Sequence, residues 1–277
     1  TTDTMVSGVH FPSETSGDVV GYRVLAANLS DLAAMGAEPR WCTLALTMEN
    51  AQDEWLAKFS NGFFGLANEY GVSLIGGDLT HGPLVVTAQL FGVGKKDHLL
   101  TRSGGNVDDH IYVTGSLGDS AAGLSLINKG IADASDRHQV LKNRFLRPTP
   151  RVSEGIAMRG IANAAIDISD GLLADLGHIC QASGCGAVID VERLPLSEEL
   201  RTLFSLEVAQ NFAICGGEDY ELCFTASPDD EPAIKKCLEP SGTKAYSIGQ
   251  LVKQPGVVCH RSGKPFMPAS TGYLHFT

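Results

Sequence analysis

The chain has 277 residues, which is long enough for one large hydrophobic core or for two domains of ordinary size. Hydrophobic residues make up 43% and charged residues 19%, a composition typical of globular proteins and not of disordered ones. The formal net charge is −11, and no lysine and arginine cluster offers the basic footprint of a nucleic-acid binder, so we expect no nucleic-acid partner. An acidic protein still binds phosphates where divalent cations mediate the contact.

The cysteines and the apolar runs indicate a cytoplasmic protein. Seven cysteines lie singly along the chain with no C-x-x-C pair, which argues for reduced thiols and against a zinc site or a disulfide framework. No apolar run reaches the roughly 20 residues that a membrane span needs, so we expect no membrane partner. The start, TTDTMVSGVHF, has no initiator methionine and no signal-peptide features, and we expect a native segment before it.

The elements predicted for the first third of the chain alternate between strands and helices. In chain order they are a strand over 1–11, a helix capped by Asp18 and ended by Gly36 and Pro39, a strand over 41–48, an amphipathic helix after Asp53, and strands over 71–78 and 83–94. A polar, glycine-rich break without periodicity follows between Arg102 and His110. We therefore predict two domains, one over residues 1–103 and one over residues 104–277.

The second domain continues the alternation. Its predicted elements are a strand over 110–115, a loop and helix over 116–130, the proline-stiffened connector RPTPR at 147–151, a strand over 165–168 with an amphipathic helix after it, a strand and exit over 186–196, a strand, glycine turn and second strand over 213–226, and strands over 245–252 and 256–263. This order predicts an α/β fold of the mixed α+β kind, in which each domain is a sheet packed with helices.

Acidic residues stand beside apolar or glycine-rich sequence at five places. They are Asp3 in TTDT, Asp31 in NLSDLAAMG, Asp78 in IGGDLT, Asp167 and Asp170 in IDISDG, and Glu218 and Asp219 in CGGEDYEL. Taken singly, Asp170 is most simply an N-cap of the following helix, and the pair Glu218 and Asp219 is an ordinary polar turn. Asp31 is harder to explain in this way, because a helical carboxylate between apolar neighbours risks costly burial.

The position of these residues at strand ends favours a shared site. Strand alternation puts Asp167 and Ser169 on one face, and Asp170 follows at the C-terminal end, where open α/β sheets bind ligands. Two carboxylates about 4 Å apart repel by about 4 kcal/mol at an effective dielectric constant of about 20, so converging carboxylates need protons or cations. Carboxylate and hydroxyl oxygens suit Mg²⁺, which shares phosphate oxygens, so the pattern favours phosphoryl transfer.

Other candidate residues have both a functional and a structural interpretation. The stretch TGSLGDSAAGL resembles a phosphate-binding loop, but a packing turn capped by Asp119 or Ser120 fits it at least as well. Arg102 either contacts phosphate or faces solvent, and His10 and Tyr273 taken alone are more simply structural. The sequence has no G-x-S-x-G elbow and no evident Cys/His pair, so covalent acyl transfer is not expected.

Nine motifs in one order resemble the thiamine-monophosphate kinase family. They are TTDTMVSGVHF, AANLSDLAAMGAEP, LIGGDLT, LTRSG, TGSLGDSAAGL, LRPTPR, AIDISDGLLADLGHI, GGEDYEL and GYLHF. The resemblance covers essentially the whole chain, and nine motifs in register are specific where a single SDGL is weak. It implies a two-domain fold similar to aminoimidazole ribonucleotide synthetase, transfer of the ATP γ-phosphoryl group to thiamine phosphate with several Mg²⁺ ions, and a homodimer formed through the N-terminal domains.

The resemblance also implies roles for individual residues. For metal binding it implies Thr1, Thr2, Asp3, Asp31, Asp78, Asp167 and Asp170, for ATP binding Gly77, Asp78, Arg102 and Ser169, and for thiamine phosphate binding His10, Glu218 and Tyr273. No general base is expected, because the acceptor phosphate oxygen is already ionised. The acidic GDD motif that the family carries before TTD is absent, so one set of metal ligands is incomplete, and Thr1 stands where the family often has serine.

Two other functions remain open at this point. One is a sister enzyme of the same fold that uses ATP with another acceptor, such as selenide or a formylglycinamidine compound. The other is a non-catalytic nucleotide- or metal-binding module that has lost its chemistry with the missing N-terminus. The motifs GGEDYEL and GYLHF favour thiamine phosphate over another acceptor, and the presence of every downstream acid favours an active enzyme.

Overall fold

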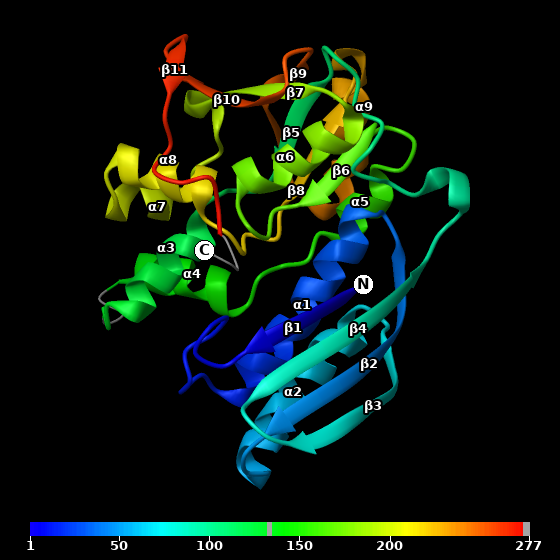
Figure 1. Ribbon diagram of the computed structural model, residues 1–277, viewed down its shortest axis with the longest axis vertical. Coiled ribbons are helices and arrows are strands. Elements are labelled where there is room, and N and C mark those ends of the chain that lie inside the picture. The colour runs from blue at the N-terminus through cyan, green and yellow to red at the C-terminus, as the bar shows by residue number, and fades with distance from the viewer. Residues whose placement is uncertain (132–134, 274–277) are drawn as a thin grey trace.

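The computed structural model describes residues 1–131 and 135–273, and within these ranges the strands form one four-stranded and one seven-stranded sheet (Figure 1). The first sheet has the order β1-β4-β2-β3. Its strands are β1 (Thr2–Val6), β2 (Glu38–Met48), β3 (Ser73–His81) and β4 (Val85–Val93). Strand β2 pairs antiparallel with β4 and parallel with β3, while β1 pairs antiparallel with β4, so β1 and β3 form the two edges.

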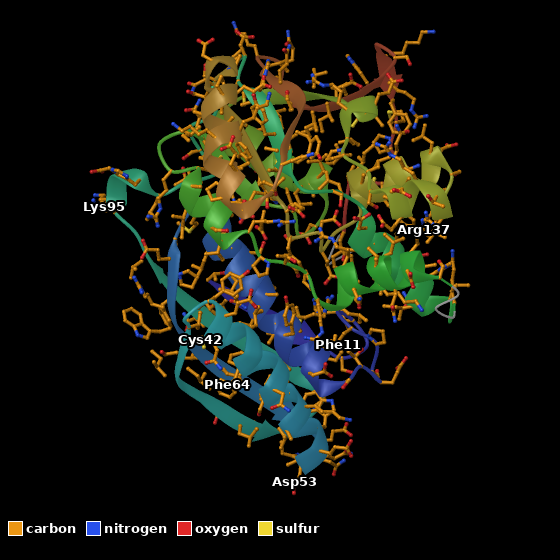
Figure 2. The ribbon with its side chains drawn as sticks, turned by 180° about the vertical axis from the view of Figure 1, so that it is seen from behind. Phe11, Cys42, Asp53, Phe64, Lys95 and Arg137 are labelled. Carbon is orange, nitrogen blue, oxygen red and sulfur yellow. The ribbon has the colours of Figure 1, made fainter. Side chains whose placement is uncertain are left out.

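Helices α1 (Gly17–Ala34) and α2 (Asp53–Glu69) lie side by side across one face of this sheet (Figure 2). In β4, Val86, Ala88 and Leu90 are buried at alternate positions, which is the pattern of a strand with one covered face. Close packing of the two helices requires glycine at Gly62, where a Cβ atom would lie 1.9 Å from the Asp18 carbonyl oxygen. Within the described residues, no helix covers the other face of the sheet, which is turned toward the viewer in Figure 1.

The seven-stranded sheet has the order β11-β10-β7-β9-β5-β8-β6. Its strands are β5 (His110–Thr114), β6 (Ala164–Asp167), β7 (Gly186–Asp190), β8 (Leu222–Ala226), β9 (Ala245–Val252), β10 (Gly256–Arg261) and β11 (Lys264–Phe266). The helices of this half are α3 (Asp119–Asn128), α4 (Asp136–Leu146), α5 (Val152–Ala157), α6 (Leu172–Ser183), α7 (Glu198–Leu203), α8 (Leu206–Cys215) and α9 (Glu231–Leu238), and short 3₁₀ helices lie at Lys96–His98, Val191–Arg193, Pro228–Asp230 and Glu239–Ser241. None of the helices in the described ranges combines the length and the hydrophobicity that crossing a membrane requires.

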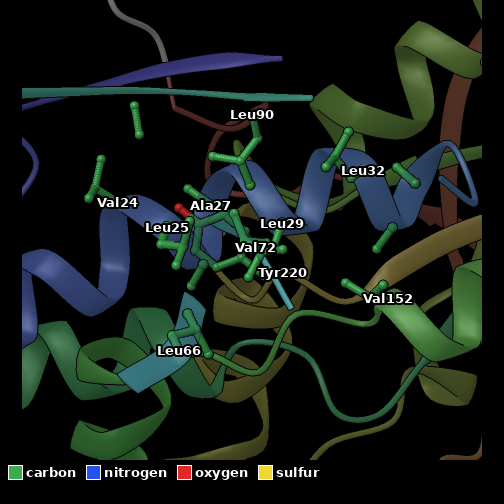
Figure 3. Packing of buried hydrophobic residues seen from close by; sticks show 14 of the residues in the cluster. Val24, Leu25, Ala27, Leu29, Leu32, Leu66, Val72, Leu90, Val152 and Tyr220 are labelled. Carbon is green, nitrogen blue, oxygen red and sulfur yellow. The ribbon is translucent and has the colours of Figure 1, made fainter. Parts of the chain in front are cut away.

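Helix α1 joins the two halves through a shared core. It is buried along most of its length and contacts β1 and β4 on one side and β6 and α5 on the other. One hydrophobic cluster includes Val24 and Leu29 of α1 and Tyr220 of the second half (Figure 3), and it extends to Phe224 in β8. A separate cluster fills the space between α6 and the seven-stranded sheet. Residues on α1, Asp31 among them, are therefore held between the two halves.

The structure confirms the mixed fold and most of the predicted elements. Helix α1 ends before Gly36, whose φ of +59° lies in the left-handed region, as the sequence predicts. Its predicted cap is wrong, because Ser16 occupies the N-cap position and its hydroxyl donates a hydrogen bond of 2.5 Å to Asp18 Oδ1. The boundary between residues 103 and 104 falls in the chain that links β4 to β5, and it stays a prediction.

Two of the predicted strand segments are wrong. Residues 8–10 form a turn after β1, because Gly8 has a φ of +77° and the His10 N–H donates to the Val6 carbonyl oxygen at 2.9 Å. Residues 213–215 are the last turn of α8, in which Ala209 and Ala213 are buried at helical spacing. Three residues are too few to show whether the apolar period is that of a strand or a helix.

Candidate active site

A cavity of about 480 Å³ lies between the two halves of the molecule. Its lining comes from β1 and the turn after it, from α1 and α3, from the loop after β6, from the segment 217–220 and from Tyr273. Asp3, Ser169 and Asp170 belong to its polar lining, whereas Phe11 and Leu124 are among the apolar residues. A mixed lining of this size suits an organic ligand that carries charged groups.

Thr1, Asp3 and Asp31 meet at the start of β1. Thr1 Oγ1 donates a hydrogen bond to Asp31 Oδ2, and the carboxyl groups of Asp3 and Asp31 are hydrogen-bonded to each other. Burial raises the pKa of Asp3 to about 7, and the charges of Asp31 and Asp170 add to this rise. Near neutral pH these carboxylates therefore need a proton or a cation to balance them. Thr2 follows on the other face of the strand and is exposed.

Asp167 ends β6 and is 96% buried, since only 4% of its surface is exposed. Ser30 Oγ, which precedes Asp31 on α1, donates a hydrogen bond of 2.7 Å to Asp167 Oδ2. Burial and, to a smaller extent, the charge of Asp31 together raise the pKa of Asp167 to about 8. Asp31 therefore interacts with carboxylates from both halves, Asp3 on β1 and Asp167 on β6.

The loop after β6 is shaped by Asp175, a residue of the first turn of α6. Its Oδ2 accepts hydrogen bonds from the N–H groups of Ser169, Asp170 and Gly171, at 3.0, 3.1 and 3.1 Å. Gly171, with a φ of +117°, occupies the N-cap position of α6, so the interpretation of Asp170 as the cap is wrong. Burial raises the pKa of Asp175 to about 7, and the charge of Asp170 adds to it.

The arrangement of the carboxylates fits a hard cation that keeps part of its water shell. Among the described residues, no group of three His, Cys, Asp or Glu side chains already forms a metal-binding set. The carboxylates interact in pairs instead, Asp3 with Asp31 and Asp31 with Asp167. Mg²⁺ commonly takes one or two carboxylates and completes its octahedron with water and phosphate oxygens. The pairs therefore fit Mg²⁺ bound together with a nucleotide.

The segment GGEDYEL brings a further carboxylate to the cavity. Glu218 and Tyr220 both have left-handed backbone, with φ of +66° and +52°. Their N–H groups donate to the carbonyl oxygens of Ser169 and Ile168, at 2.8 and 2.9 Å, which ties the segment to the loop after β6. Gly217 permits this approach, because a Cβ atom there would lie 2.3 Å from the Ser169 carbonyl oxygen. Glu218 is thereby held against the cavity.

The next residue of this segment decides the role of the glycine-rich stretch before α3. The carboxylate of Asp219 accepts hydrogen bonds from the N–H groups of Gly118 and Ser120, at 2.7 and 3.2 Å, so a protein carboxylate already occupies this helix N-terminus. Asp119 accepts instead from Ser116 Oγ at 2.5 Å. The stretch TGSLGDSAAGL is therefore a packing turn, and capping by Asp119 or Ser120 is wrong.

His10 and Tyr273 line the same cavity as Glu218. His10 Nδ1 accepts a hydrogen bond of 3.0 Å from the Val6 N–H, which fixes the ring against the end of β1. The Tyr273 N–H donates to the Asp170 carbonyl oxygen at 2.9 Å, and 48% of the residue is exposed. Residues 274–276 of the motif GYLHF lie outside the described residues. One cavity thus gathers the three residues that the resemblance assigns to thiamine phosphate.

Similar proteins identify the family. The family models described as AIR synthase related protein match residues 1–95 with the N-terminal domain and residues 106–261 with the C-terminal domain. Thiamine-monophosphate kinase from Escherichia coli K12 is 47% identical, covering 99% of this chain and 85% of that protein. The corresponding protein from Buchnera aphidicola of Acyrthosiphon pisum is 50% identical, covering 99% and 86%.

The chain belongs to the thiamine-monophosphate kinase family. Solved structures of the family agree with its fold. Thiamine-monophosphate kinase from Stenotrophomonas maltophilia K279a superposes with a TM-score of 0.91 at 44% identity, covering 95% of this chain and 84% of that chain. A structure described as AaThiL complexed with AMPPCP and TMP gives 0.87 at 31% identity, covering 100% and 86%. The hydrogenase maturation protein HypE, at 17% identity and a TM-score of 0.76, shares the fold alone. The predicted aminoimidazole ribonucleotide synthetase-like fold is confirmed.

Gly77, Asp78 and Arg102, which the resemblance assigns to the site, lie apart from both the cavity lining and the carboxylates of Asp3, Asp31 and Asp167. Gly77 and Asp78 lie on β3, at the sheet edge opposite β1, and Asp78 accepts a hydrogen bond of 3.0 Å from Thr80 Oγ1. Three strand spacings put them about 14 Å from Asp3, too far to share one cation within one chain. Arg102 is exposed in the link between the sheets. Their roles stay predictions.

Conversely, sequence reasoning missed residues that hold this thiamine-monophosphate kinase family site together. Ser30, Asp175 and Arg23 each hydrogen-bond a residue of the site, yet none lies in the cavity lining. Ser30 and Asp175 could have been found from the sequence, because both lie inside motifs that contain predicted metal ligands. Nothing in the sequence points to Arg23, since its partner Glu218 lies 195 residues away in the chain.

Proposed function

We propose that the chain transfers the γ-phosphoryl group of ATP to thiamine phosphate, forming thiamine diphosphate and ADP. The observation that supports this most is one cavity lined by Asp3 and Asp170 and also by His10, Glu218 and Tyr273. Carboxylates suited to a phosphate-bound cation thus stand beside residues suited to an organic cation. Relatives named thiamine-monophosphate kinase, and the related structure with the ATP analogue AMPPCP and TMP, support the same pair of substrates.

The proposed transfer depends on positioning and charge neutralisation. A phosphate oxygen of the acceptor is ionised near neutral pH, so direct in-line attack on the γ-phosphorus needs no general base. Asp3, Asp31, Asp167 and Asp170 are the residues that would hold Mg²⁺, and the bound ions would supply positive charge to the transferring phosphoryl group. Asp175 fixes the backbone of the loop that carries Asp170 and Ser169, the residue proposed to contact ATP.

The rest of the lining suits the organic part of thiamine phosphate. Its thiazolium ring is a permanent cation, which a carboxylate such as Glu218 attracts where water is partly excluded. The half-exposed ring of Tyr273 offers an aromatic face, which also attracts cations. Phe11 adds apolar surface, because it lines the cavity and is otherwise buried. The lining therefore matches a flat cation joined to a phosphate.

The deciding experiment follows both products with purified protein, ATP and Mg²⁺. We expect thiamine diphosphate and ADP to form in equal amounts from thiamine phosphate, measured by chromatography. A panel of other acceptors, including selenide and a formylglycinamidine ribonucleotide, should give no ADP above the background without acceptor. ADP release with one of these acceptors instead would identify a sister enzyme. Binding of ATP with Mg²⁺ but no product with any acceptor would identify a non-catalytic module.

We also propose a homodimer formed through the first sheet. Trp41 and Phe91 pair across β2 and β4 on the face that no helix of the described ranges covers, and they are 45% and 40% exposed. On the edge strand β3, Ile75 and Leu79 are 61% and 64% exposed. An open apolar sheet face beside an unpaired edge favours association with a second copy of the chain.

Light scattering after gel filtration tests the dimer. We expect a mass of about twice the 29.3 kDa of one chain. Trp41→Glu places a charge on the open sheet face and should give monomers. Phe64→Glu is the matched control, because Phe64 is similarly exposed, at 42%, but lies on α2, on the covered side of the sheet. A monomeric wild type, or a dimer that Trp41→Glu leaves intact, would contradict this interface.

A cytoplasmic location is a further part of the proposal. The seven cysteines are all free thiols, and Cys42, Cys180, Cys185, Cys223 and Cys259 are buried. Burial raises the pKa of the Cys42 thiol to about 11 and that of Cys180 to about 12, so these thiols are protonated and unreactive at neutral pH. Buried free thiols support a reducing compartment.

A further inference from the structure

Arg23, in the second turn of α1, is a fully buried arginine whose guanidinium reaches three other segments. Its Nη2 lies 2.5 Å from Glu218 Oε1 and 3.4 Å from the His10 carbonyl oxygen, and its Nη1 donates to the Phe145 carbonyl oxygen. Its Cζ lies 3.9 Å from the centre of the Phe145 ring. One side chain therefore joins α1 to the turn after β1, to the end of α4 and to the segment GGEDYEL.

The burial of this guanidinium is informative because it is costly. An ionised group loses its hydration when it is buried, and its ion pair and hydrogen bonds offset only part of that loss. Nε of Arg23 has no hydrogen-bond partner among the described residues, so the compensation is incomplete. An apolar side chain of similar volume would fill this space without that cost. Packing alone therefore does not explain an arginine here.

What arginine adds is a rigid planar fork that sets the direction of its partners. Glu218 keeps 25% of its side chain exposed and lines the cavity, while its Oε1 is bound by Arg23. The same Nη2 contacts the carbonyl oxygen of His10, a second lining residue. Two residues of the cavity, which lie 208 positions apart in the chain, are thus aligned by one group.

We propose that Arg23 is a positioning residue for thiamine phosphate, which holds Glu218 and the backbone of His10 in the geometry that receives the thiazolium cation. The inference rests on the proposed function, because it takes thiamine phosphate to be the ligand of Glu218. Arg23 is itself a cation, and it does not belong to the cavity lining. Its effect on a cationic ring is therefore geometric and passes through the carboxylate of Glu218.

The test compares Arg23→Lys with a matched control, using the full chain. Lysine keeps the charge but loses the planar fork, so we expect KM and Kd for thiamine phosphate to rise about tenfold while KM for ATP changes by less than about twofold. Arg147→Lys is the control, because Arg147 likewise pairs with a carboxylate, that of Asp18. Its Cζ also lies over an aromatic ring, 5.1 Å from the centre of Tyr22. Arg147 does not line the cavity, so both constants should stay unchanged in this variant.

A double-variant cycle shows whether Arg23 acts through Glu218. Calorimetry gives Kd for thiamine phosphate in Glu218→Ala and in Glu218→Ala combined with Arg23→Lys. If Arg23 acts mainly through Glu218, Arg23→Lys weakens binding much less in the Glu218→Ala background than in the wild type. Additive weakening would overturn the proposal, and so would an equal rise of KM for both substrates in Arg23→Lys.

A second variant, which leaves Arg23 in place, keeps the inference testable if Arg23→Lys does not fold. If thermal unfolding shows that Arg23→Lys does not fold, Phe145→Leu removes only the ring under the guanidinium and should raise Kd for thiamine phosphate about threefold. An unchanged Kd in Phe145→Leu would then count against the inference. A wild type that forms no thiamine diphosphate contradicts the proposed function, whereas an active wild type with an unaltered Arg23→Lys contradicts only the inference.

Discussion

The carboxylate of Asp175 accepts hydrogen bonds from three successive N–H groups, those of Ser169, Asp170 and Gly171. An N-cap side chain usually accepts hydrogen bonds of this kind from backbone N–H groups, but here the acceptor is a residue inside the helix. Because Asp175 accepts the hydrogen bonds of these N–H groups, the side chain of Asp170 is not needed as a cap and instead lines the cavity. Its charge also raises the pKa of Asp3 and of Asp175, so its replacement affects more than one carboxylate.

Replacing Asp170 tests its role as a ligand of Mg²⁺. In Asp170→Asn, measured with saturating Mg²⁺, we expect kcat to fall by about a hundredfold or more, because the amide lacks the charge that binds a divalent cation. The melting temperature should change little or rise, because a carboxylate that repels Asp3 and Asp175 is removed. Asp97→Asn, at an exposed position of the link between the sheets, is the control and should keep full activity. Near wild-type turnover in Asp170→Asn would remove it from the set of ligands.

Sequence reasoning identified the acids themselves but not what holds them. Asp3, Asp31, Asp167 and Asp170 stand out because each lies beside apolar sequence, and the structure brings them to one junction between the two halves. Asp175 appears in the sequence as one more polar residue of an amphipathic helix, since hydrogen bonds to the backbone of a preceding loop leave no periodic trace. Arg23 appears as an ordinary polar residue of α1, because only the packing of α1 against the second half creates its environment.

The segment GGEDYEL is the element on which the cavity depends most. Consecutive residues point to different parts of the molecule: Glu218 lines the cavity, Asp219 caps α3 and Tyr220 enters the shared core. Glu221, which is fully buried, binds Arg144 and Arg151 at 2.7 and 2.6 Å. The sequence predicts a turn here from its glycines, but a turn with four buried or half-buried anchors cannot be read from polar letters alone.

The close approach at Gly217 gives a prediction at the scale of this element. Gly217→Ala introduces a Cβ atom 2.3 Å from the Ser169 carbonyl oxygen, so the segment must move away from the loop after β6. We expect a loss of about 1–3 kcal/mol in the free energy of unfolding and a rise in KM for thiamine phosphate through displaced Glu218. Chemical denaturation and steady-state kinetics measure the two effects.

Gly177→Ala on α6 is the matched control for this substitution. A Cβ atom at Gly177 meets no atom within 4 Å, and the residue lies in the interior of a helix. Alanine should therefore stabilise the protein by about 0.5–1 kcal/mol and leave both KM values unchanged. If the two glycine variants lose stability equally, the argument from close approach at Gly217 is wrong.

For the molecule as a whole, the hydrophobic core and the acidic site have opposite effects on stability where the two halves meet. Helix α1 buries apolar residues against both sheets, and this packing carries Ser30 and Asp31 into the space between Asp3 and Asp167. Folding therefore brings together carboxylates that repel one another when ionised. Burial further disfavours their ionised form. A cation that binds there relieves the repulsion, so metal binding and overall stability are linked.

This linkage predicts how stability depends on pH. Without Mg²⁺, Asp3 and Asp167 have pKa values of about 7 and about 8 in the folded protein, raised by burial and by Asp31, whereas the unfolded chain releases these protons near its ordinary pKa of about 4. Between pH 5 and pH 8 the folded state therefore binds more protons than the unfolded state, and the free energy of unfolding falls as pH rises. Since Mg²⁺ replaces these protons, it should raise the melting temperature by about 5 °C at pH 8 and much less at pH 5.

Asp31→Asn separates this linkage from a general effect of salt. The variant removes the charge that raises the pKa of both Asp3 and Asp167, so the fall of stability with pH should become shallower. It also removes a proposed ligand, so the stabilisation by Mg²⁺ at pH 8 should shrink in the same variant. Thermal unfolding at a series of pH values, with and without Mg²⁺ at constant ionic strength, measures both changes. If Mg²⁺ stabilises the wild type equally at pH 5 and pH 8, protons and cations do not compete at this junction, and the carboxylates would have to be balanced in another way.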